Sequence, residues 1–362
     1  RQRQMCIRDR AYALAEHADC LLRLGRAAPA LVGARQALGL ARGSDRMSYQ
    51  RALVLAGRAQ RALGQREAAL ASFAEAAAIV EELRAAVAGG EATRERFLSA
   101  STDPYLALAE LHLAEGRTAE ALAQVERAKG RVLLDVLAAG RVQVRKLLTA
   151  AERTEEQRLE QELAGLGRDL RRERQRRKPD AARQAELEQR LGAARRARED
   201  LLTRLYAGHP GLRTLRGEVA PLSPSDLAEL APDAGTALLE YSLGPDGLSL
   251  FVVAREGGEP RLTLHRLGDG AAVAHDVREL RRRLAARDRE AVALSLRLYD
   301  QLLRPAAARL AGRQQLVVIP DGVLWELPFQ ALSPRPGRYL VEDHGLSYAP
   351  SLTVLREMRR RR

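Results

Sequence analysis

The sequence predicts a multidomain protein that is α-helical over its first two thirds and α/β over its last third. Three observations support this fold class. A spacing of small residues recurs three times early in the chain, leucines follow a heptad pattern in the middle, and β-branched runs separated by turn residues appear only near the end. We expect three domains, at residues 1–140, 141–210 and 211–362.

The composition of the 362 residues fits a protein with a packed core. Apolar residues make up 46% of the chain, which is ample for such a core, and no apolar run is long enough to span a bilayer. The only cysteines are Cys6 and Cys20, too few for a disulfide scaffold. We therefore expect a cytoplasmic protein in a reducing compartment.

The net charge of +13 raises the question of nucleic-acid binding. Only three of the 60 basic residues are lysines, and arginines occur in nearly every segment, a bias that GC-rich coding produces. The Gly and aromatic pattern of an RNA-binding sheet does not accompany them. We expect weak, nonspecific attraction to polyanions rather than specific nucleic-acid recognition.

Three segments of the first domain share one spacing of small residues. Small residues let two antiparallel helices approach closely, and a glycine ends the first helix where a left-handed residue is needed. Each segment is therefore expected to form a helical hairpin. The three segments are Ala18, Gly25, Ala30 and Ala37; Gly57, Gly64, Ala69 and Ala76; and Ala109, Gly116, Ala121 and Ala128.

This pattern resembles the tetratricopeptide repeat, in which stacked hairpins form a solenoid with a concave peptide-binding face. The glycines lie farther apart than the usual period of about 34 residues, so we expect lengthened second helices or an insertion around Gly89-Gly90. An irregular helical bundle is the alternative.

The resemblance to tetratricopeptide repeats implies that the first helices line the inner face and bind a protein or peptide partner. A solvated charged face without a partner is the alternative. The candidate partner-binding residues are Asp19, Arg23, Arg58, Arg61 and Glu110.

The middle of the chain, from about Leu147 to Leu205, is charged and almost free of aromatic residues. Lys178-Pro179-Asp180 predicts a helix stop followed by an N-cap. We expect two long antiparallel helices that pack as a coiled coil and serve as a spacer or docking arm. The basic run at 171–178 could instead contact an anionic partner. The expected seam comprises Leu159, Leu163, Leu166 and Leu170 on one helix and Leu187, Leu191, Ala194, Leu201 and Leu205 on the other.

The last third begins with PLSPSDLAEL, a loop followed by a Ser- or Asp-capped helix. Three strands joined by tight turns then form an antiparallel meander, and two helices and two further strands complete an α/β sheet. The expected strands are Thr236–Leu243, Leu248–Glu256, Arg261–Leu267, Leu316–Ile319 and Tyr339–Ser351, and the expected helices are Ala272–Ala286 and Glu290–Leu310.

Several blocks in this order resemble the CHAT domain, a caspase-like family related to separases that usually follows helical repeats. The resemblance implies an incomplete caspase-like α/β sheet domain. The blocks are TALLEYSLG, the Leu-Tyr and Leu-Leu pattern at 298–303, VVIPDGVLWELPFQAL and LVEDHGLSYAPSLTVL.

CHAT peptidases use a His/Cys dyad whose two positions follow the YAPS segment, and this chain stops at Arg362, before both. We therefore assign no catalytic residue. Cys20 is expected to be a small buried side chain in a repeat helix. No metal-ligand spacing or phosphate-binding loop is present, so we expect no metal and no cofactor. The histidines, expected to be surface or packing residues, are His17, His112, His209, His265, His275 and His344.

Asp321 and Gly322 leave a predicted core strand at the sheet edge where α/β proteins usually build their sites. Pro-Asp-Gly is also ordinary turn chemistry, and we favour that structural role. The residues that follow are expected to pack in the core: Leu324, Trp325, Leu327 and Phe329.

The leading hypothesis is the N-terminal fragment of a bacterial CHAT-family cysteine peptidase, itself inactive, whose repeats recognise a protein partner. A non-catalytic protein–protein interaction scaffold is the alternative, and a polyanion-binding protein is a third, weaker one. Coding sequence beyond Arg362 with a His-Gly block and a strand-terminal cysteine would favour the peptidase over the scaffold.

Overall fold

The computed structural model describes residues 2–42, 45–86, 102–139, 148–174, 176, 180–209 and 222–360. The chain forms two compact units. One contains Arg1–Val80, Ser99–Gly130 and Pro221–Arg362, and the other contains Glu81–Leu98 and Arg131–Ala220. Most of the helical hairpins thus share one unit with the sheet, although the last residues of two of their helices, from Glu81 and from Arg131 onward, belong to the other unit. The domain limits expected from the sequence stay predictions. No described helix combines the length and the hydropathy that a membrane span needs.

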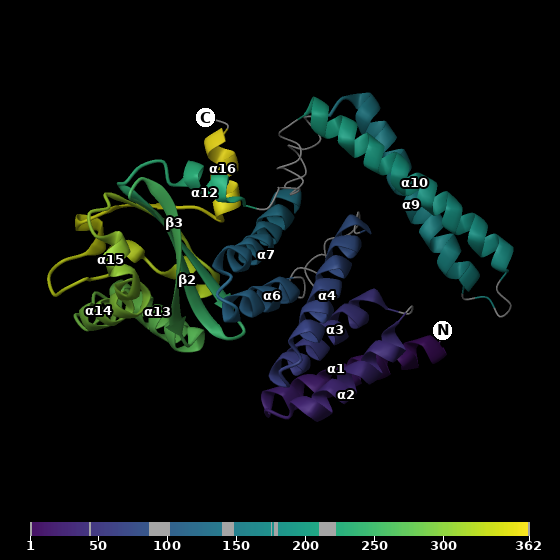
Figure 1. Ribbon diagram of the computed structural model, residues 1–362, viewed down its shortest axis with the longest axis horizontal. Coiled ribbons are helices and arrows are strands. Elements are labelled where there is room, and N and C mark those ends of the chain that lie inside the picture. Colours follow the sequence, from purple (N-terminus) through teal and green to yellow (C-terminus); the bar gives the residue numbers. More distant parts are fainter. Residues whose placement is uncertain are drawn as a thin grey trace. The chain divides into compact units, whose positions relative to one another are not determined.

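Six helices of the first part of the chain form three hairpins (Figure 1). All three hairpins turn in the same way. The turn glycines Gly25, Gly64 and Gly116 have φ angles of 71°, 73° and 71°, and the amide of the next residue donates to a carbonyl five residues back, at 2.8 to 2.9 Å. The predicted hairpins are confirmed. They are α1 (Gln2–Arg23) with α2 (Ala27–Ala41), α3 (Arg46–Ala62) with α4 (Arg66–Ala86), and α6 (Asp103–Ala114) with α7 (Thr118–Ala139).

Small residues lie where the two helices of each hairpin meet. Ala18, Ala30, Ala69 and Ala121 have no exposed surface, and at Gly57 a side chain would collide with the ring of Phe73. The first helices of successive hairpins also contact each other, α1 with α3 and α3 with α6. The predicted insertion around Gly89-Gly90 lies outside the described residues.

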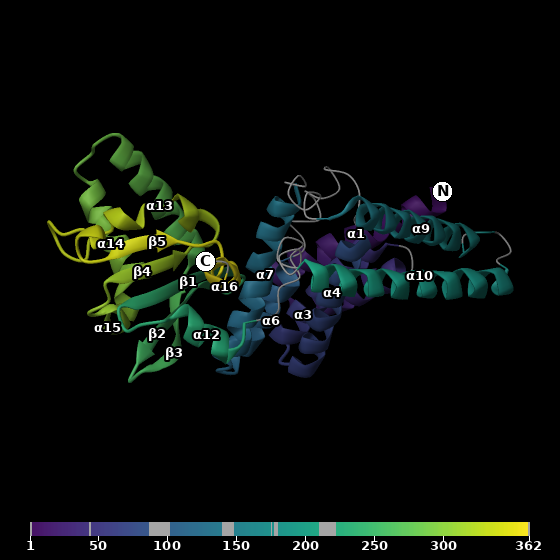
Figure 2. The same cartoon turned by 90° about the horizontal axis from the view of Figure 1, so that it is seen from above.

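The last part of the unit holds a mixed five-stranded sheet in the order β3-β2-β1-β4-β5 (Figure 2). The first three strands form the predicted antiparallel meander, whereas β4 runs parallel to both β1 and β5. The carboxyl ends of β1, β4 and β5 therefore lie at one edge of the sheet. The strands are β1 (Thr236–Gly244), β2 (Gly247–Glu256), β3 (Glu259–Gly268), β4 (Gln315–Ile319) and β5 (Gly345–Tyr348).

Helices cover both faces of this sheet (Figure 1). Leu239 and Val318 pack on one face against α13 (Gly270–Ala285) and α14 (Ala291–Leu302). Leu238 and Ile319 point to the other face, which packs against α6 and α7 of the last hairpin and against α12 (Pro224–Leu230) and α16 (Leu352–Arg360). The last repeat is thus part of the core of the sheet domain.

Two predicted elements are shorter than the sequence suggested. The helix expected over Glu290–Leu310 breaks after Leu302, because Pro305 has no amide hydrogen; a 3₁₀ turn (Arg304–Ala306) and α15 (Ala307–Leu310) follow. The strand expected over Tyr339–Ser351 is limited to β5. Leu340–Glu342 forms a 3₁₀ turn instead, since the Glu342 carboxylate accepts a hydrogen bond from the Tyr339 amide at 2.6 Å.

The core packing predicted after β4 is correct for Leu324, Leu327 and Phe329, which are at most 2% exposed. It is wrong for Trp325, whose surface is 51% exposed. Gly322–Glu326 forms a 3₁₀ helix, and with three residues per turn neighbouring residues face different sides. Leu324 points inward, and the next residue points to solvent.

The second unit contains the predicted helical hairpin, α9 (Ala150–Arg174) and α10 (Ala181–Gly208). Asp180 caps α10 by accepting hydrogen bonds from the amides of Ala182 and Arg183. The leucine seam is confirmed, although Leu163 and Leu191 are only partly buried against it. The fully buried members are Leu159, Leu166, Leu170, Leu187, Ala194, Leu201 and Leu205.

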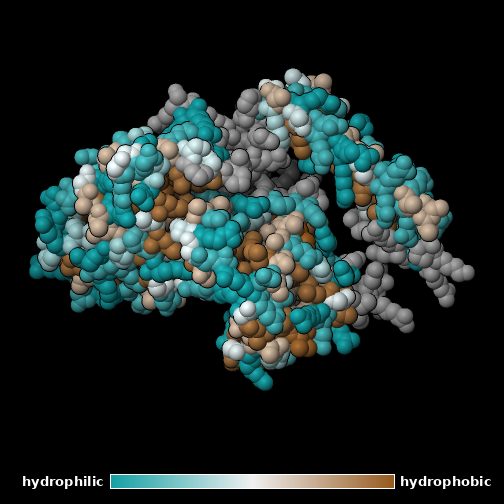
Figure 3. Space-filling view, viewed as in Figure 1, coloured by the Kyte–Doolittle hydropathy of each residue, from teal (hydrophilic) through white to brown (hydrophobic). Residues whose placement is uncertain are grey.

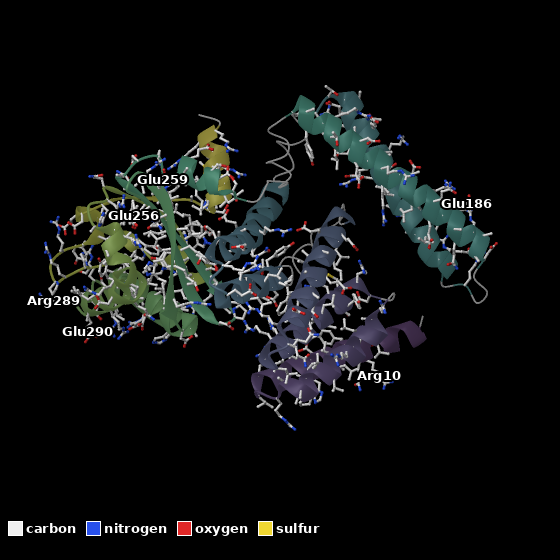
Figure 4. All side chains as sticks on the ribbon, in the orientation of Figure 1. Arg10, Glu186, Glu256, Glu259, Arg289 and Glu290 are labelled. Atoms are coloured by element: carbon white, nitrogen blue, oxygen red, sulfur yellow. The ribbon has the colours of Figure 1, made fainter. Side chains whose placement is uncertain are left out.

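The outer surface of the hairpin is charged. The side visible in Figure 3 is mostly hydrophilic. Glu186, labelled in Figure 4, is exposed and pairs with Arg183 within α10. Part of the basic run at 171–178 lies outside the described residues.

Candidate functional site

The first helices of the repeats carry interleaved charges. On α1, Arg23 Nε donates to Asp19 Oδ2 at 2.9 Å. On α3, the Arg58 guanidinium lies 3.9 Å from the Asp19 carboxylate and donates to Asp103 of α6 at 3.2 Å. Arg58 thus bridges acidic side chains of both neighbouring helices. The structure brings together three of the five predicted partner-binding residues, Asp19, Arg23 and Arg58.

The other two predicted residues, Arg61 and Glu110, bind the sheet. Arg61 holds Asp246, in the turn between β1 and β2, through two hydrogen bonds of 2.6 and 2.7 Å. Glu110 accepts a hydrogen bond from Arg266 of β3 at 2.8 Å. Burial raises the pKa of Glu110, while Arg266 opposes the shift. Sequence reasoning missed both pairings because the partners lie more than 150 positions away.

The Pro-Asp-Gly turn after β4 has a structural role. An Asp321 carboxylate oxygen accepts a hydrogen bond from the amide of Leu243 near the end of β1, at 2.7 Å. Gly322 has a φ of 51°, which other residues rarely adopt. The carboxylate therefore continues the pairing of β4 with β1 beyond the last bridged residues, as the structural interpretation of this turn predicts.

A buried polar cluster lies at the same sheet edge, on the face covered by α7. Glu240 of β1 is 1% exposed, and the side chain of Lys129 is 8% exposed. Lys129 Nζ lies 3.4 Å from Glu240 Oε1 and donates to the carbonyl oxygens of Ile319 and Pro320 at 3.3 and 3.2 Å. Glu126, one helical turn earlier, accepts hydrogen bonds from the amides of Leu352 and Thr353 at 2.8 and 2.7 Å.

Burial raises the pKa of Glu240 well above its ordinary value, and the nearby Glu126 carboxylate raises it further, while Lys129 opposes both effects. Because Glu240 is 1% exposed, a molecule in solution cannot reach its carboxyl group. The sequence offered one signal that this cluster exists. Glu240 is the single charged residue in the strand TALLEYSLG, and apolar side chains flank it along most of that strand.

The described residues contain no group of three or more His, Cys, Asp or Glu side chains that could hold a metal ion. Cys20 is exposed on α1, so the expectation that it is buried is wrong. The side chain of Cys6 lies outside the described part. None of the polar contacts found for the histidines in the described part involves a cysteine.

The histidines that have hydrogen-bond partners serve the local structure. His344 Nδ1 lies 2.6 Å from the carbonyl oxygen of Arg313, and His209 lies 3.1 Å from Glu152 at the base of the helical hairpin. His112 is buried in α6, and burial lowers its pKa.

Comparison with known families gives one match. Residues 292–362 match the family model of the CHAT domain. No curated protein matches the chain. The matched range includes β4, β5 and α16, and thus the sheet edge to which Glu126 and Lys129 bind. The last part of the chain is therefore similar to the CHAT domain, a caspase-like family related to peptidases.

Proposed function

We propose that this chain is a protein-recognition module in which tetratricopeptide-like repeats bind a partner segment beside a CHAT-related sheet domain. The supporting observation is the charged row that runs across the first helices. Guanidinium and carboxylate groups of α1, α3 and α6 alternate there, and Arg58 remains 29% exposed while touching both neighbours. Such a row offers a partner backbone and its polar side chains both hydrogen-bond donors and acceptors.

The repeat geometry supports this proposal. The three glycine turns have nearly the same φ and the same turn hydrogen bond, and the first helices of successive hairpins are neighbours. Repeats that stack in this way create an extended surface on the side of their first helices. We place the partner on that surface, at Asp19, Arg23 and Arg58. Arg61 and Glu110 mark its boundary, because both are engaged by the sheet.

We further propose that the chain itself does not hydrolyse peptide bonds. The two cysteines of the sequence, Cys6 and Cys20, both belong to α1, in the first repeat. The matched residues 292–362 contain one histidine, His344, which is bound to the backbone. A cysteine nucleophile needs a base within hydrogen-bond reach, and neither cysteine lies in the matched region.

A non-catalytic scaffold is the second candidate function. The observation that favours it is the packing of α6 and α7 on the sheet, which makes the CHAT-related part a structural partner of the repeats. The peptidase-fragment and scaffold hypotheses both predict partner binding and differ in the chemistry of the complete protein.

The recognition proposal is tested by selecting peptides from a random displayed library on the immobilised chain. The affinity of the selected peptides is then measured for Arg58→Gln and for the control Arg297→Gln, which removes an exposed guanidinium that pairs with Asp276 on the far face of the sheet. We expect at least a tenfold loss for Arg58→Gln alone. Equal affinities, or no enrichment at all, would refute the proposed surface.

The absence of peptidase activity is tested by incubating the chain with unfolded casein and with peptide libraries. We expect no new termini by mass spectrometry. Cleavage by the wild-type chain that is lost in Cys20→Ser would show that the chain contains a working nucleophile, and it would overturn this part of the proposal.

A further inference from the structure

Two side chains of α7 bind the carboxyl edge of the parallel strands. Glu126 and Lys129 lie three residues apart, so they project from the same side of the helix. Between them they contact the end of β4, the Glu240 side chain of β1, and the first turn of α16, which follows β5. One helix of the last repeat thus reaches all three parallel strands or the segments that follow them.

Lys129 has three oxygen neighbours at this edge. The Nζ atom donates to the carbonyl oxygens of Ile319 and Pro320 at 3.3 and 3.2 Å. It also lies 3.4 Å from Glu240 Oε1, as an ion pair without a hydrogen bond to that carboxyl group. Ile319 is the last residue of β4 and Pro320 begins the turn that carries Asp321. If Lys129 moved, two backbone carbonyls in a nearly dry environment would lose their donor.

Glu126 completes the start of α16. The first amides of a helix have no intrahelical acceptor, and the two oxygens of Glu126 accept from two of them, at Leu352 and Thr353. Glu126 is 3% exposed, so water cannot replace it readily. The negative carboxylate also favours the positive end of the helix dipole.

These directional bonds stand in an otherwise apolar interface. Leu122 and Val125 of α7 pack there against Val317 of β4 and Leu352 of α16. Apolar contacts tolerate small sliding movements, whereas buried hydrogen bonds to fixed backbone atoms are satisfied in one register only. The position of α7 and the conformation of the sheet edge are therefore coupled.

We propose that Glu126 and Lys129 form a polar clamp through which the last repeat sets the conformation of the turn after β4 and the start of α16. The clamp consists of Glu126, Lys129 and Glu240. The clamp would transmit a displacement of the repeats to this sheet edge. Binding of the partner proposed above is one possible cause of such a displacement. The clamp itself needs no partner, so its tests do not depend on the proposed function.

The first test is hydrogen exchange of the full chain, followed by mass spectrometry. We expect at least tenfold faster exchange in residues 319–328 for Lys129→Met and in residues 350–356 for Glu126→Gln. The matched control is Glu120→Gln, on the same helix, whose partner Arg117 is an exposed neighbour; it should leave both segments unchanged. Unchanged exchange at both segments in the folded clamp variants would overturn the proposal.

A second variant separates the clamp from general stability. Lys129→Met combined with Glu240→Leu replaces the buried polar pair by apolar side chains of similar size, an exchange that often preserves stability. We expect a melting temperature close to that of the wild type together with fast exchange at 319–328. Exchange that rises evenly over the whole sheet domain would assign these residues a purely structural role and would overturn the clamp.

Transmission is tested by perturbing the last repeat at its turn. Gly116→Ala strains a residue with a φ of 71° and has no neighbouring atom to collide with. It should speed exchange at 319–328 in the wild-type background and add nothing in the Lys129→Met, Glu240→Leu background. An equal effect in both backgrounds would show that the clamp carries no coupling.

Discussion

Replacing Gly57 by alanine should destabilise the second hairpin, although alanine is the better helix former. A Cβ at this position would lie 2.5, 2.8 and 2.9 Å from three atoms of the Phe73 ring. Carbon atoms prefer about 3.5 to 4.0 Å, so the ring must move by about 1 Å. Phe73 has no exposed surface, and the surrounding core must yield with it.

The magnitude follows from two opposing contributions. Overpacking of a well-filled core costs about 1–3 kcal/mol, whereas glycine to alanine in a helix gains about 0.5–1 kcal/mol. We expect a net loss of about 1–2 kcal/mol for Gly57→Ala. Gly39 of α2 is the matched control, because it is exposed and a methyl group added there would have no atom within 4 Å. Gly39→Ala should therefore stabilise its hairpin by about 0.5–1 kcal/mol.

Hydrogen exchange of the amides in α2, α3 and α4 measures the local opening free energy of each hairpin separately. A Gly57→Ala variant as stable as Gly39→Ala would refute the close-packing argument. The double variant Gly57→Ala with Phe73→Leu gives a further check, since a smaller side chain removes the collision. We expect a coupling of at least about 1 kcal/mol between the two substitutions.

Three further predictions concern the turn, the clamp and the α12–α16 contact. Gly64 has a φ of 73° and open space around it, so Gly64→Ala should lower the stability of its hairpin by about 1 kcal/mol. Hydrogen exchange of the α3 and α4 amides measures this loss. The raised pKa of Glu240 means that its contribution to stability is fully present below the ordinary value of 4.5 and is lost as pH rises towards the folded value. Glu240→Gln cannot ionise, so its melting temperature should rise relative to that of the wild type as pH increases from 5 to 8. A difference in melting temperature that stays constant over this range would contradict the burial argument. Arg356→Met should cost about 3–5 kcal/mol at neutral pH, because it removes a 2.9 Å partner of the nearly buried Asp226, and this cost should shrink in acid as Asp226 becomes protonated.

The sign of the last effect follows from the surroundings of Asp226. Burial alone would raise its pKa, but hydrogen bonds from the Ser223 amide and hydroxyl and the charge of Arg356 outweigh burial and lower it. Stability from a lowered carboxyl pKa is present at neutral pH and is lost as pH falls through the folded value. Arg360 also binds Asp226, at 2.9 Å, and would retain part of the effect in the variant.

Local signals in the sequence predicted the local structure well. The glycine of each repeat turn, the Asp180 cap and the Ser223 cap of α12 all act within a few residues, and each is present as predicted. The strands of the meander were recognisable because their alternation and their turn residues are also local. Pro305 indicates the helix break after α14. The break was not predicted because leucines continue the helical pattern on both sides of this proline.

Contacts between distant segments were not predictable in the same way. Arg61 and Glu110 were predicted to line one groove because both belong to the first helices of their repeats. Their partners are Asp246, in the turn between β1 and β2, and Arg266 of β3. The position of these segments against α3 and α6 is decided by the apolar face shared with the sheet. A charged residue on a repeat helix is equally compatible with solvent, a partner or another part of the chain. Only the tertiary packing distinguishes these cases.

Glu240 shows how a sequence can signal a long-range contact without identifying it. A carboxyl group in an apolar strand buried on both sides must be neutral or must have a partner, because an isolated buried charge is too costly. The strand therefore requires a polar group from another element, and α7 provides two in Glu126 and Lys129. The amide donors and carbonyl acceptors that these two residues satisfy belong to the region matched by the CHAT family model. The last repeat is thus a component of that sheet domain, and substitutions in α7 should be judged by their effect on the sheet edge as well as on the repeats.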